Sequence, residues 1–285
     1  MSLYVTMPSR VNEVLSDLGF WYLLTGILGF LAWPALIISP IWMEMMVGLF
    51  IGITAVLGII AFVTYLIALL KTRELKEMTG EDMLSLGPSL AIIGIFFVII
   101  MLIVLVVFFI TFLFYVSGPS ISMNALIQAP PPGEPTTTTI IIIPMIIFMG
   151  LGGVGAILVL IGLILTAIGF WKFGEMNKSS IIQIGGILMI FLFNIGALIL
   201  GLGLREIASK GRSALANETL LNTVKDYLDK QAPRGVSIDL RDVGSQYNIP
   251  GVLMIQLVKY WIMTGELQGT LSGYYYIPPP QRQEG

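Results

Sequence analysis

Five long segments of this 285-residue chain contain no charged side chain, and they decide what it can fold into. Each segment exceeds the roughly 20 apolar helical residues that cross the hydrocarbon core of a bilayer. Because every backbone polar group in lipid needs an internal partner, such segments cross as helices. The sequence therefore predicts an all-α polytopic membrane bundle over residues 1–204. Its transmembrane helices, about five, are expected at about residues 20–42, 45–70, 91–116, 140–171 and 181–204.

Residues 216–285 show several short elements instead of spans. Asn217 and Asp239 stand in N-cap positions, and apolar residues recur at helical spacing after each of them. A third helical segment stops at Gly265, and two strand-like segments around a two-residue turn follow it. The order helix, strand, helix, turn, helix and two strands predicts a small α+β winged-helix domain. Residues 205–215 are expected to be the tether that joins it to the bundle.

The sequence of this domain carries a family resemblance between about Leu221 and Pro280. The segments VSIDLRDVGSQYNIP and LVKYWIMTGELQGTLSG resemble the PCI-type winged helix of DDRGK-domain proteins. Those proteins are membrane-anchored partners of the ligase that attaches the ubiquitin-fold modifier. The resemblance therefore implies a partner in a ubiquitin-like modifier system. The matching positions are Leu240, Val243, Ile255, Val258, Ile262, Gly265, Leu267, Gly269 and Ile277.

The third helix of this domain, from Gly251 to about Thr264, is apolar on more than one side. One arc is expected to face the domain core, and a second arc is expected to hold a protein partner. The alternative is that the second arc packs on the first helix, on the wing or on the membrane surface. Tyrosines of the last strand are further candidates, because aromatic side chains anchor interfaces. The expected core residues are Ile255, Val258 and Ile262, and the expected partner-binding residues are Leu253, Leu257, Tyr260, Trp261, Tyr274 and Tyr276.

The charge of the domain favours a protein partner over nucleic acid. Residues 205–285 carry nine basic and eight acidic side chains, so the basic surface of a nucleic-acid binder is missing. In the third helix only Gln256 and Lys259 suit contacts to base edges or phosphates. We therefore expect no strong nucleic-acid binding.

No residue pattern in the chain predicts catalysis. Cysteine and histidine are absent from the sequence, which removes the usual zinc and haem ligands and the nucleophile and base pairs that need them. The predicted spans contain no charged side chain, which argues against proton- or ion-coupled transport. We expect a non-enzymatic protein with no cofactor, no metal site and no catalytic residues.

Small and polar residues inside the apolar segments are expected to pack the membrane helices. Gly48 and Gly52 have the GxxxG spacing, and Gly152 lies in a glycine-rich stretch, and both patterns let helix backbones approach one another. Asn194 is the most polar residue near the middle of a span, where an unpaired amide is costly. An interhelical hydrogen bond is its expected role, and contact with a permeant is the alternative.

The predicted topology contains a conflict. With five spans, the side of the N-terminal tail holds six basic residues near the membrane, and the side of the C-terminal domain holds three, Arg205, Lys210 and Arg212. The positive-inside rule then places the winged helix outside, on the side of the proline-rich loop over residues 117–139. Winged helices of this kind have cytosolic partners, however. We therefore expect a cytoplasmic C-terminal domain in spite of the count.

The sequence favours a membrane-anchored adaptor whose winged helix docks a protein partner at the bilayer. The resemblance suggests that this partner is a component of a ubiquitin-like modifier system. A membrane-tethered transcription regulator is the first alternative, and a transporter or channel with a regulatory winged helix is the second. The sequence leaves the oligomeric state open.

Overall fold

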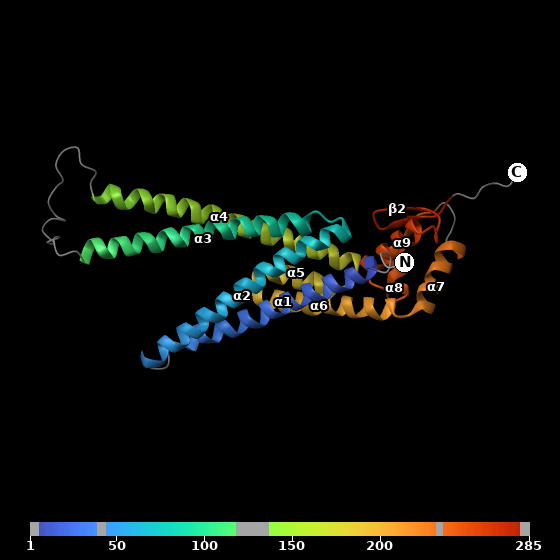
Figure 1. Ribbon diagram of the computed structural model, residues 1–285, viewed down its shortest axis with the longest axis horizontal. Coiled ribbons are helices and arrows are strands. Elements are labelled where there is room, and N and C mark those ends of the chain that lie inside the picture. Colours follow the sequence, from blue (N-terminus) through green and yellow to red (C-terminus); the bar gives the residue numbers. More distant parts are fainter. Residues whose placement is uncertain (1–5, 39–43, 118–136, 232–235, 280–285) are drawn as a thin grey trace. The chain divides into compact units, whose positions relative to one another are not determined.

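The computed structural model describes residues 6–38, 44–117, 137–231 and 236–279 (Figure 1). Among these residues, four helices are long and apolar enough to cross a membrane. They are α1 (Thr6–Ile38), α2 (Glu44–Thr79), α3 (Met83–Ser117) and α4 (Thr137–Met176). Their apolar stretches run for 25 to 28 residues, and about 20 residues suffice for a bilayer core. The predicted membrane-helix character of the chain is therefore confirmed.

The chain divides into two compact units, Met1–Pro88 with Ile164–Gly285, and Ser89–Leu163. In the second unit, α3 and α4 meet at small residues. An ideal Cβ on Gly94 would lie only 2.6 Å from the carbonyl oxygen of Gly155, so a larger residue there would push the two backbones apart. The Met101 side chain lies against Gly152, one of the glycines expected to pack helices.

In the first unit, the predicted fifth span forms two short helices that fold back on each other. They are α5 (Ser180–Phe191) and α6 (Phe193–Leu215), and the chain reverses at Leu192, where φ is −133° and ψ is 66°. Glycines allow the return, since an ideal Cβ on Gly185 would lie 2.7 Å from the Leu200 nitrogen, and one on Gly203 would lie 2.8 Å from the Ile182 side chain. The prediction of one continuous helix over residues 181–204 is therefore wrong. At 1.5 Å per residue the 12 residues of α5 reach about 18 Å, too short for a core of about 30 Å.

The predicted tether over residues 205–215 is the C-terminal half of α6. In this part of α6, Gly211 is buried against α1, and the Asn12 side chain occupies the space that a Cβ on Gly211 would need. Residues 205–215 are therefore a packed helix and not a flexible connection, because Gly211 lets α1 approach its backbone.

The α1–α6 pair packs closely at a second asparagine. Asn194 of α6 lies over Gly29 of α1, and an ideal Cβ on nearby Gly26 would be 2.7 Å from the Asn194 carbonyl oxygen. Midway between the two asparagine contacts, an ideal Cβ on Gly201 would lie 2.5 Å from the Leu23 nitrogen. Asn194 thus lies in an interhelical contact between α6 and α1.

Buried hydroxyls join α1 to α2. The hydroxyl oxygens of Tyr22 and Thr72 are 2.9 Å apart, and Thr25 donates a hydrogen bond of 3.0 Å to Thr64. On α2, a Cβ on Gly52, one of the two glycines of the expected GxxxG contact, would meet open space among the described residues. The surroundings of Gly48 lie outside the described side chains.

The C-terminal part begins with α7 (Glu218–Asp226), which continues as one π-helical turn over Tyr227–Gln231. Strand β1 (Ile238–Asp239), α8 (Leu240–Gln246), α9 (Gly251–Met263), β2 (Thr270–Ser272) and β3 (Tyr275–Ile277) follow. The three strands form an antiparallel sheet in the order β1-β3-β2, in which Ile238 and Leu271 both pair with Tyr276.

Local chemistry sets the limits of these elements. Asn217 and Asp239 accept hydrogen bonds from the backbone nitrogens of Leu220 and Arg241, so both predicted N-caps are present. The turn between β2 and β3 contains Gly273 with φ of 60°, a conformation that glycine adopts without strain. The shared core includes Val224, Leu228, Leu240, Val243, Leu253, Leu257, Val258, Trp261, Leu267 and Tyr276.

Candidate functional site

The first turn of α9 lies against the end of the helical bundle. Pro250, at its N-cap position, offers no side-chain hydrogen bond, and the missing cap comes from elsewhere in the chain. The side-chain oxygen of Asn177, in the loop after α4, accepts a 3.1 Å hydrogen bond from the Val252 nitrogen. The Asn177 amide nitrogen also donates a 2.8 Å bond to the carbonyl of Phe173 in α4. Asn177 is therefore fixed on the bundle and caps a helix of the C-terminal domain.

Glycine is required at the start of α9 because two backbones meet there. A Cβ on Gly251 would collide with the carbonyl oxygen of Met176, the last residue of α4. Beside this contact, Lys178 forms an ion pair with Asp242 of α8. Lys178 itself has φ of 51°, a left-handed conformation in which the chain turns from α4 into α5.

A second hydrogen bond joins α9 to the end of α2. The Gln256 side chain is 8% exposed, and its amide nitrogen donates a 2.7 Å bond to the carbonyl of Met78. Backbone carbonyls in the last turn of a helix have no hydrogen-bond partner within the helix. Gln256 therefore supplies the partner for the Met78 carbonyl at the end of α2. The sequence makes Gln256 a candidate for contact with a nucleic-acid base, but its side chain binds the bundle instead.

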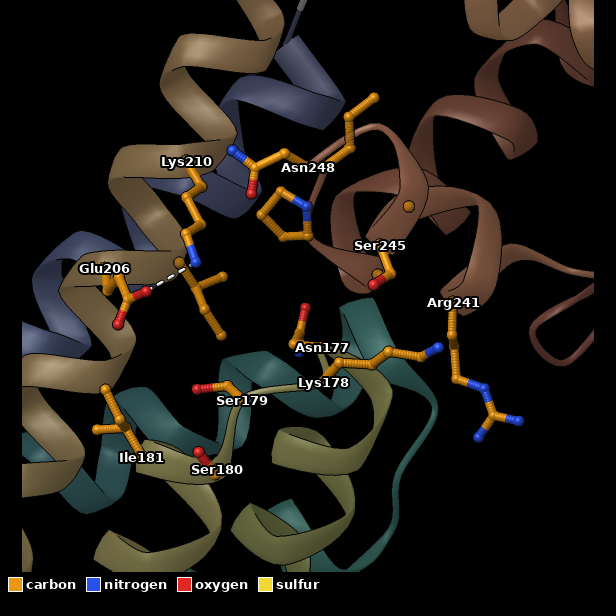
Figure 2. Close-up of a pocket in the computed structure, with 15 residues that line it drawn as sticks. Asn177, Lys178, Ser179, Ser180, Ile181, Glu206, Lys210, Arg241, Ser245 and Asn248 are labelled. Atoms are coloured by element: carbon orange, nitrogen blue, oxygen red, sulfur yellow. Dashed lines mark ion pairs between the residues drawn. The ribbon is translucent and has the colours of Figure 1, made fainter.

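A pocket of about 200 Å³ lies between the α4–α5 loop, α6 and the turn from α8 to α9 (Figure 2). Lys210 of α6 extends toward Glu206 one turn earlier, at 2.7 Å. The side chains of Lys178 and Arg241 extend away from Lys210 and Glu206 (Figure 2). The other polar side chains of the wall are those of Asn177, Ser179, Ser180, Ser245 and Asn248.

Arg241 is fixed at the start of α8 by Asp239. Its Nη2 and Nε donate hydrogen bonds of 2.6 Å and 3.0 Å to the two carboxylate oxygens. Burial opposes ionisation of Asp239, but the hydrogen bonds and charge of Arg241 outweigh it and hold the Asp239 pKa below its ordinary value. The guanidinium also lies 4.3 Å from the centre of the Tyr274 ring, within cation–π range.

The prediction that the second arc of α9 is free to bind a partner is wrong for three of its residues. Leu253, Leu257 and Trp261 are 0%, 3% and 5% exposed, and all three belong to the core of the C-terminal domain. Of the expected core residues, Val258 is buried and Ile255 is only partly buried. The reason is that α9 has contacts on two sides, with α8 and β2 in its own domain and with α1 and α2 of the bundle.

The tyrosines expected to bind a partner separate into three environments. Tyr276 is buried and donates a hydrogen bond of 2.5 Å to the Gln268 carbonyl, so it is a core residue. Tyr260 is partly buried against the same core. Tyr274 is 39% exposed.

Asn177 and Gln256 join α9 to the ends of α4 and α2, and the sequence predicts neither contact. One sequence signal points to Asn177, since Asn177-Lys178-Ser179-Ser180 is a short polar segment between two apolar ones. Among the described residues, no group of three or more acidic, histidine or cysteine side chains is arranged to hold a metal ion.

No family model matches the chain, and no curated protein or solved structure matches it either.

Proposed function

We propose that the protein is a membrane-anchored adaptor in which a winged-helix domain, held on the end of the helical bundle at the cytoplasmic surface, binds a protein partner. The observation that carries this proposal is the direction of α9. Its first turn is capped by Asn177, and Gln256 one turn later binds α2. A helix that reads DNA inserts its N-terminal residues into the major groove. In this domain those residues face the bundle, which favours a protein partner.

The α5–α6 hairpin supports the proposed side of the membrane. If α1 to α4 cross the bilayer and the hairpin enters and returns on one side, the C-terminal domain lies on the side of the N-terminal tail. All 15 lysines and arginines then lie on that side, because residues 39–43 and 118–136 contain none. The predicted conflict of six basic residues against three disappears. The positive-inside rule makes this side cytoplasmic.

The tip of the hairpin supports its insertion into lipid. Phe191 is 77% exposed and Leu192 is 52% exposed on the protein surface, and both are apolar. The backbone of Leu192 is also satisfied, since its nitrogen donates a 2.7 Å bond to Leu188 and its carbonyl accepts a 2.8 Å bond from Gly196. Non-helical backbone at membrane depth needs such internal partners. The hairpin is therefore suited to the bilayer and not to water.

The surface left for a partner is the outer face of the small sheet. Tyr275 and Ile277 alternate with buried Tyr276 on β3, and they are 38% and 36% exposed. Exposed Tyr274 lies next to them. Aromatic side chains of this kind anchor protein interfaces. The resemblance to DDRGK-domain proteins makes a component of a ubiquitin-like modifier system the proposed partner.

A photo-crosslinking residue placed at Tyr275 in the full-length chain tests the adaptor function in cells. We expect a cross-link to one protein partner, identified by mass spectrometry as a modifier-system component. A matched probe at Leu105, an apolar residue of α3 that is 47% exposed, should give no such product. Cross-links from Tyr275 to lipid alone, or to DNA, would contradict the proposal.

A further inference from the structure

We propose that α3 and α4 form a lipid-contact surface matched to a thick bilayer, one whose hydrocarbon core exceeds the roughly 30 Å of an average membrane. This inference depends on the proposed crossing of the membrane by these helices, and not on the partner of the C-terminal domain. Three features of α3 and α4 carry it: the length of their apolar runs, the charges at one end of these runs, and the exposed apolar side chains along them.

The apolar runs of α3 and α4 are longer than those of α1 and α2. Residues 90–116 of α3 and 140–171 of α4 contain no charged side chain, and they number 27 and 32. The corresponding runs of α1 and α2, residues 18–38 and 45–70, number 21 and 26. Each run of the second pair is therefore longer by six residues, which at 1.5 Å per residue is about 9 Å.

Tilting does not remove the excess length. At 1.5 Å per residue the runs of α3 and α4 are about 40 Å and about 48 Å long. Transmembrane helices tilt by about 20° on average, and at this angle the two runs span about 38 Å and about 45 Å. At about 40°, the steep end of the observed range, the run of α4 still spans about 37 Å. A core of about 30 Å therefore leaves part of α4 uncovered.

Charged residues fix one end of both runs. Lys172 directly follows Trp171 in α4, and it forms an ion pair of 2.9 Å with Glu81 of the turn before α3. Lys76 pairs with Asp82 of the same turn at 2.8 Å. Trp171 suits the membrane–water interface, where tryptophan is enriched. Moving the runs toward this side would bury the charges in lipid, so the excess length lies at the other end.

The exposed side chains at that other end are apolar. Ile146 lies 25 positions before Trp171, about 38 Å along α4, and it is 63% exposed. On α3, Ile110 lies 20 positions after Leu90, about 30 Å along the helix, and it is 47% exposed. A contiguous apolar surface of this kind is unfavourable in water, whereas the acyl chains of a thick bilayer cover it.

The match between helix and bilayer has a consequence for location. Membranes rich in sterol and sphingolipid have cores a few Å thicker than average, and mismatch sorts proteins among membranes of different thickness. The acyl-chain region of such a membrane is the partner that this surface fits. The length of α3 and α4 thus gives the chain a preference for thick membranes.

The test uses the full-length chain in vesicles of three phosphatidylcholines with successively longer acyl chains, the dimyristoleoyl, dioleoyl and dierucoyl lipids. Because the natural chain has no cysteine, Ile146→Cys supplies a single site for a membrane-impermeant maleimide added on both sides. Leu160→Cys is the matched control, since Leu160 is 54% exposed but lies only about 16 Å from Trp171 along α4, well inside each core. Thermal unfolding of the wild type is followed in the same vesicles.

We expect Ile146→Cys to react in the dimyristoleoyl bilayer and to be protected in the dierucoyl bilayer. Leu160→Cys should be protected in all three. The unfolding midpoint of the wild type should rise by roughly 4 °C or more from the shortest lipid to the longest, because mismatch is unfavourable. Equal labelling of Ile146→Cys in all three bilayers, with no rise in the midpoint, overturns the inference alone. Labelling of Leu160→Cys would also contradict the proposed membrane crossing of α4.

A shortened variant tests the length itself. Deleting residues 103–109 of α3 and 143–149 of α4 removes about two turns from each helix, beyond the contact of Met101 with Gly152. Its unfolding midpoint should be highest in the dioleoyl bilayer. Val106→Leu changes the same segment without shortening it and should behave as the wild type. A shortened variant that is still most stable in the dierucoyl bilayer would overturn the inference.

Discussion

The side-chain oxygen of Asn177 accepts a hydrogen bond of 3.1 Å from the backbone nitrogen of Val252, 75 positions later in the chain. Asn177 belongs to the loop that ends α4, and Val252 belongs to the first turn of α9. A residue of the bundle therefore caps a helix of the C-terminal domain, and the cap exists only while the two are docked.

Replacing Asn177 by alanine should loosen this docking. Loss of an N-cap costs about 1 kcal/mol of stability, and here the lost bond also joins α9 to the loop after α4. We expect faster hydrogen exchange at Val252 and at the rest of the first turn of α9. Asn217→Ala is the matched control, because Asn217 caps α7 within its own domain. It should lower stability by a similar amount while the exchange of α9 stays unchanged. Identical exchange patterns in the two variants would contradict the role given to Asn177.

Glycine substitutions should separate packed positions from open ones. Gly201→Ala should lower the melting temperature of the purified protein, since its Cβ would lie 2.5 Å from the Leu23 backbone nitrogen of α1. Gly52→Ala should be neutral or raise the melting temperature, because the site is open and alanine favours helices over glycine by roughly 0.5–1 kcal/mol. Thermal unfolding in one detergent compares the two. Equal effects would show that α1 and α6 do not meet at Gly201.

Aspartate substitutions test which surface of the C-terminal domain faces out. Leu257→Asp should unfold the domain, because Leu257 is 3% exposed in its core and a buried charge costs several kcal/mol. Tyr275→Asp should leave the domain folded and abolish co-purification of the partner. Circular dichroism melts of each full-length variant provide the measurement. A folded Leu257→Asp protein would instead support the sequence-based prediction that the second arc of α9 is exposed.

The elements of the C-terminal domain were predictable because local chemistry fixes them. Asn217 and Asp239 cap helices through hydrogen bonds to residues two or three positions away, and such caps are visible in the sequence. The faces of α9 were not predictable in the same way. Gln256 and Val252 are buried by the bundle, a long-range contact that leaves no periodic pattern within the helix. In sequence, an apolar helix that is buried on two faces has the same pattern as a helix with one face in the core and one apolar face exposed for a partner.

The hairpin was hidden for a related reason. The segment at the turn, Phe191-Leu192-Phe193, has no glycine, proline or polar residue that would mark a reversal of the chain. The apolar run around it therefore has the pattern of one span. The signal that was present is the set of glycines on both sides of Leu192, which allow the two arms to pack closely. Glycine also suits packing between separate spans, so this signal becomes specific only when the paired positions are known.

Cysteine labelling in sealed vesicles tests the central claim most directly, since the natural chain has no cysteine. Single cysteines are placed at Ser9 near the N-terminal end of α1, at Gln128 between α3 and α4, and at Lys259 in the C-terminal domain. Each is treated with a membrane-impermeant maleimide before and after the vesicles are opened. With the hairpin, Ser9→Cys and Lys259→Cys should label on the same side, the cytoplasmic one, and Gln128→Cys on the other. Labelling of Lys259→Cys together with Gln128→Cys, opposite Ser9→Cys, would mean five full spans and would contradict the account.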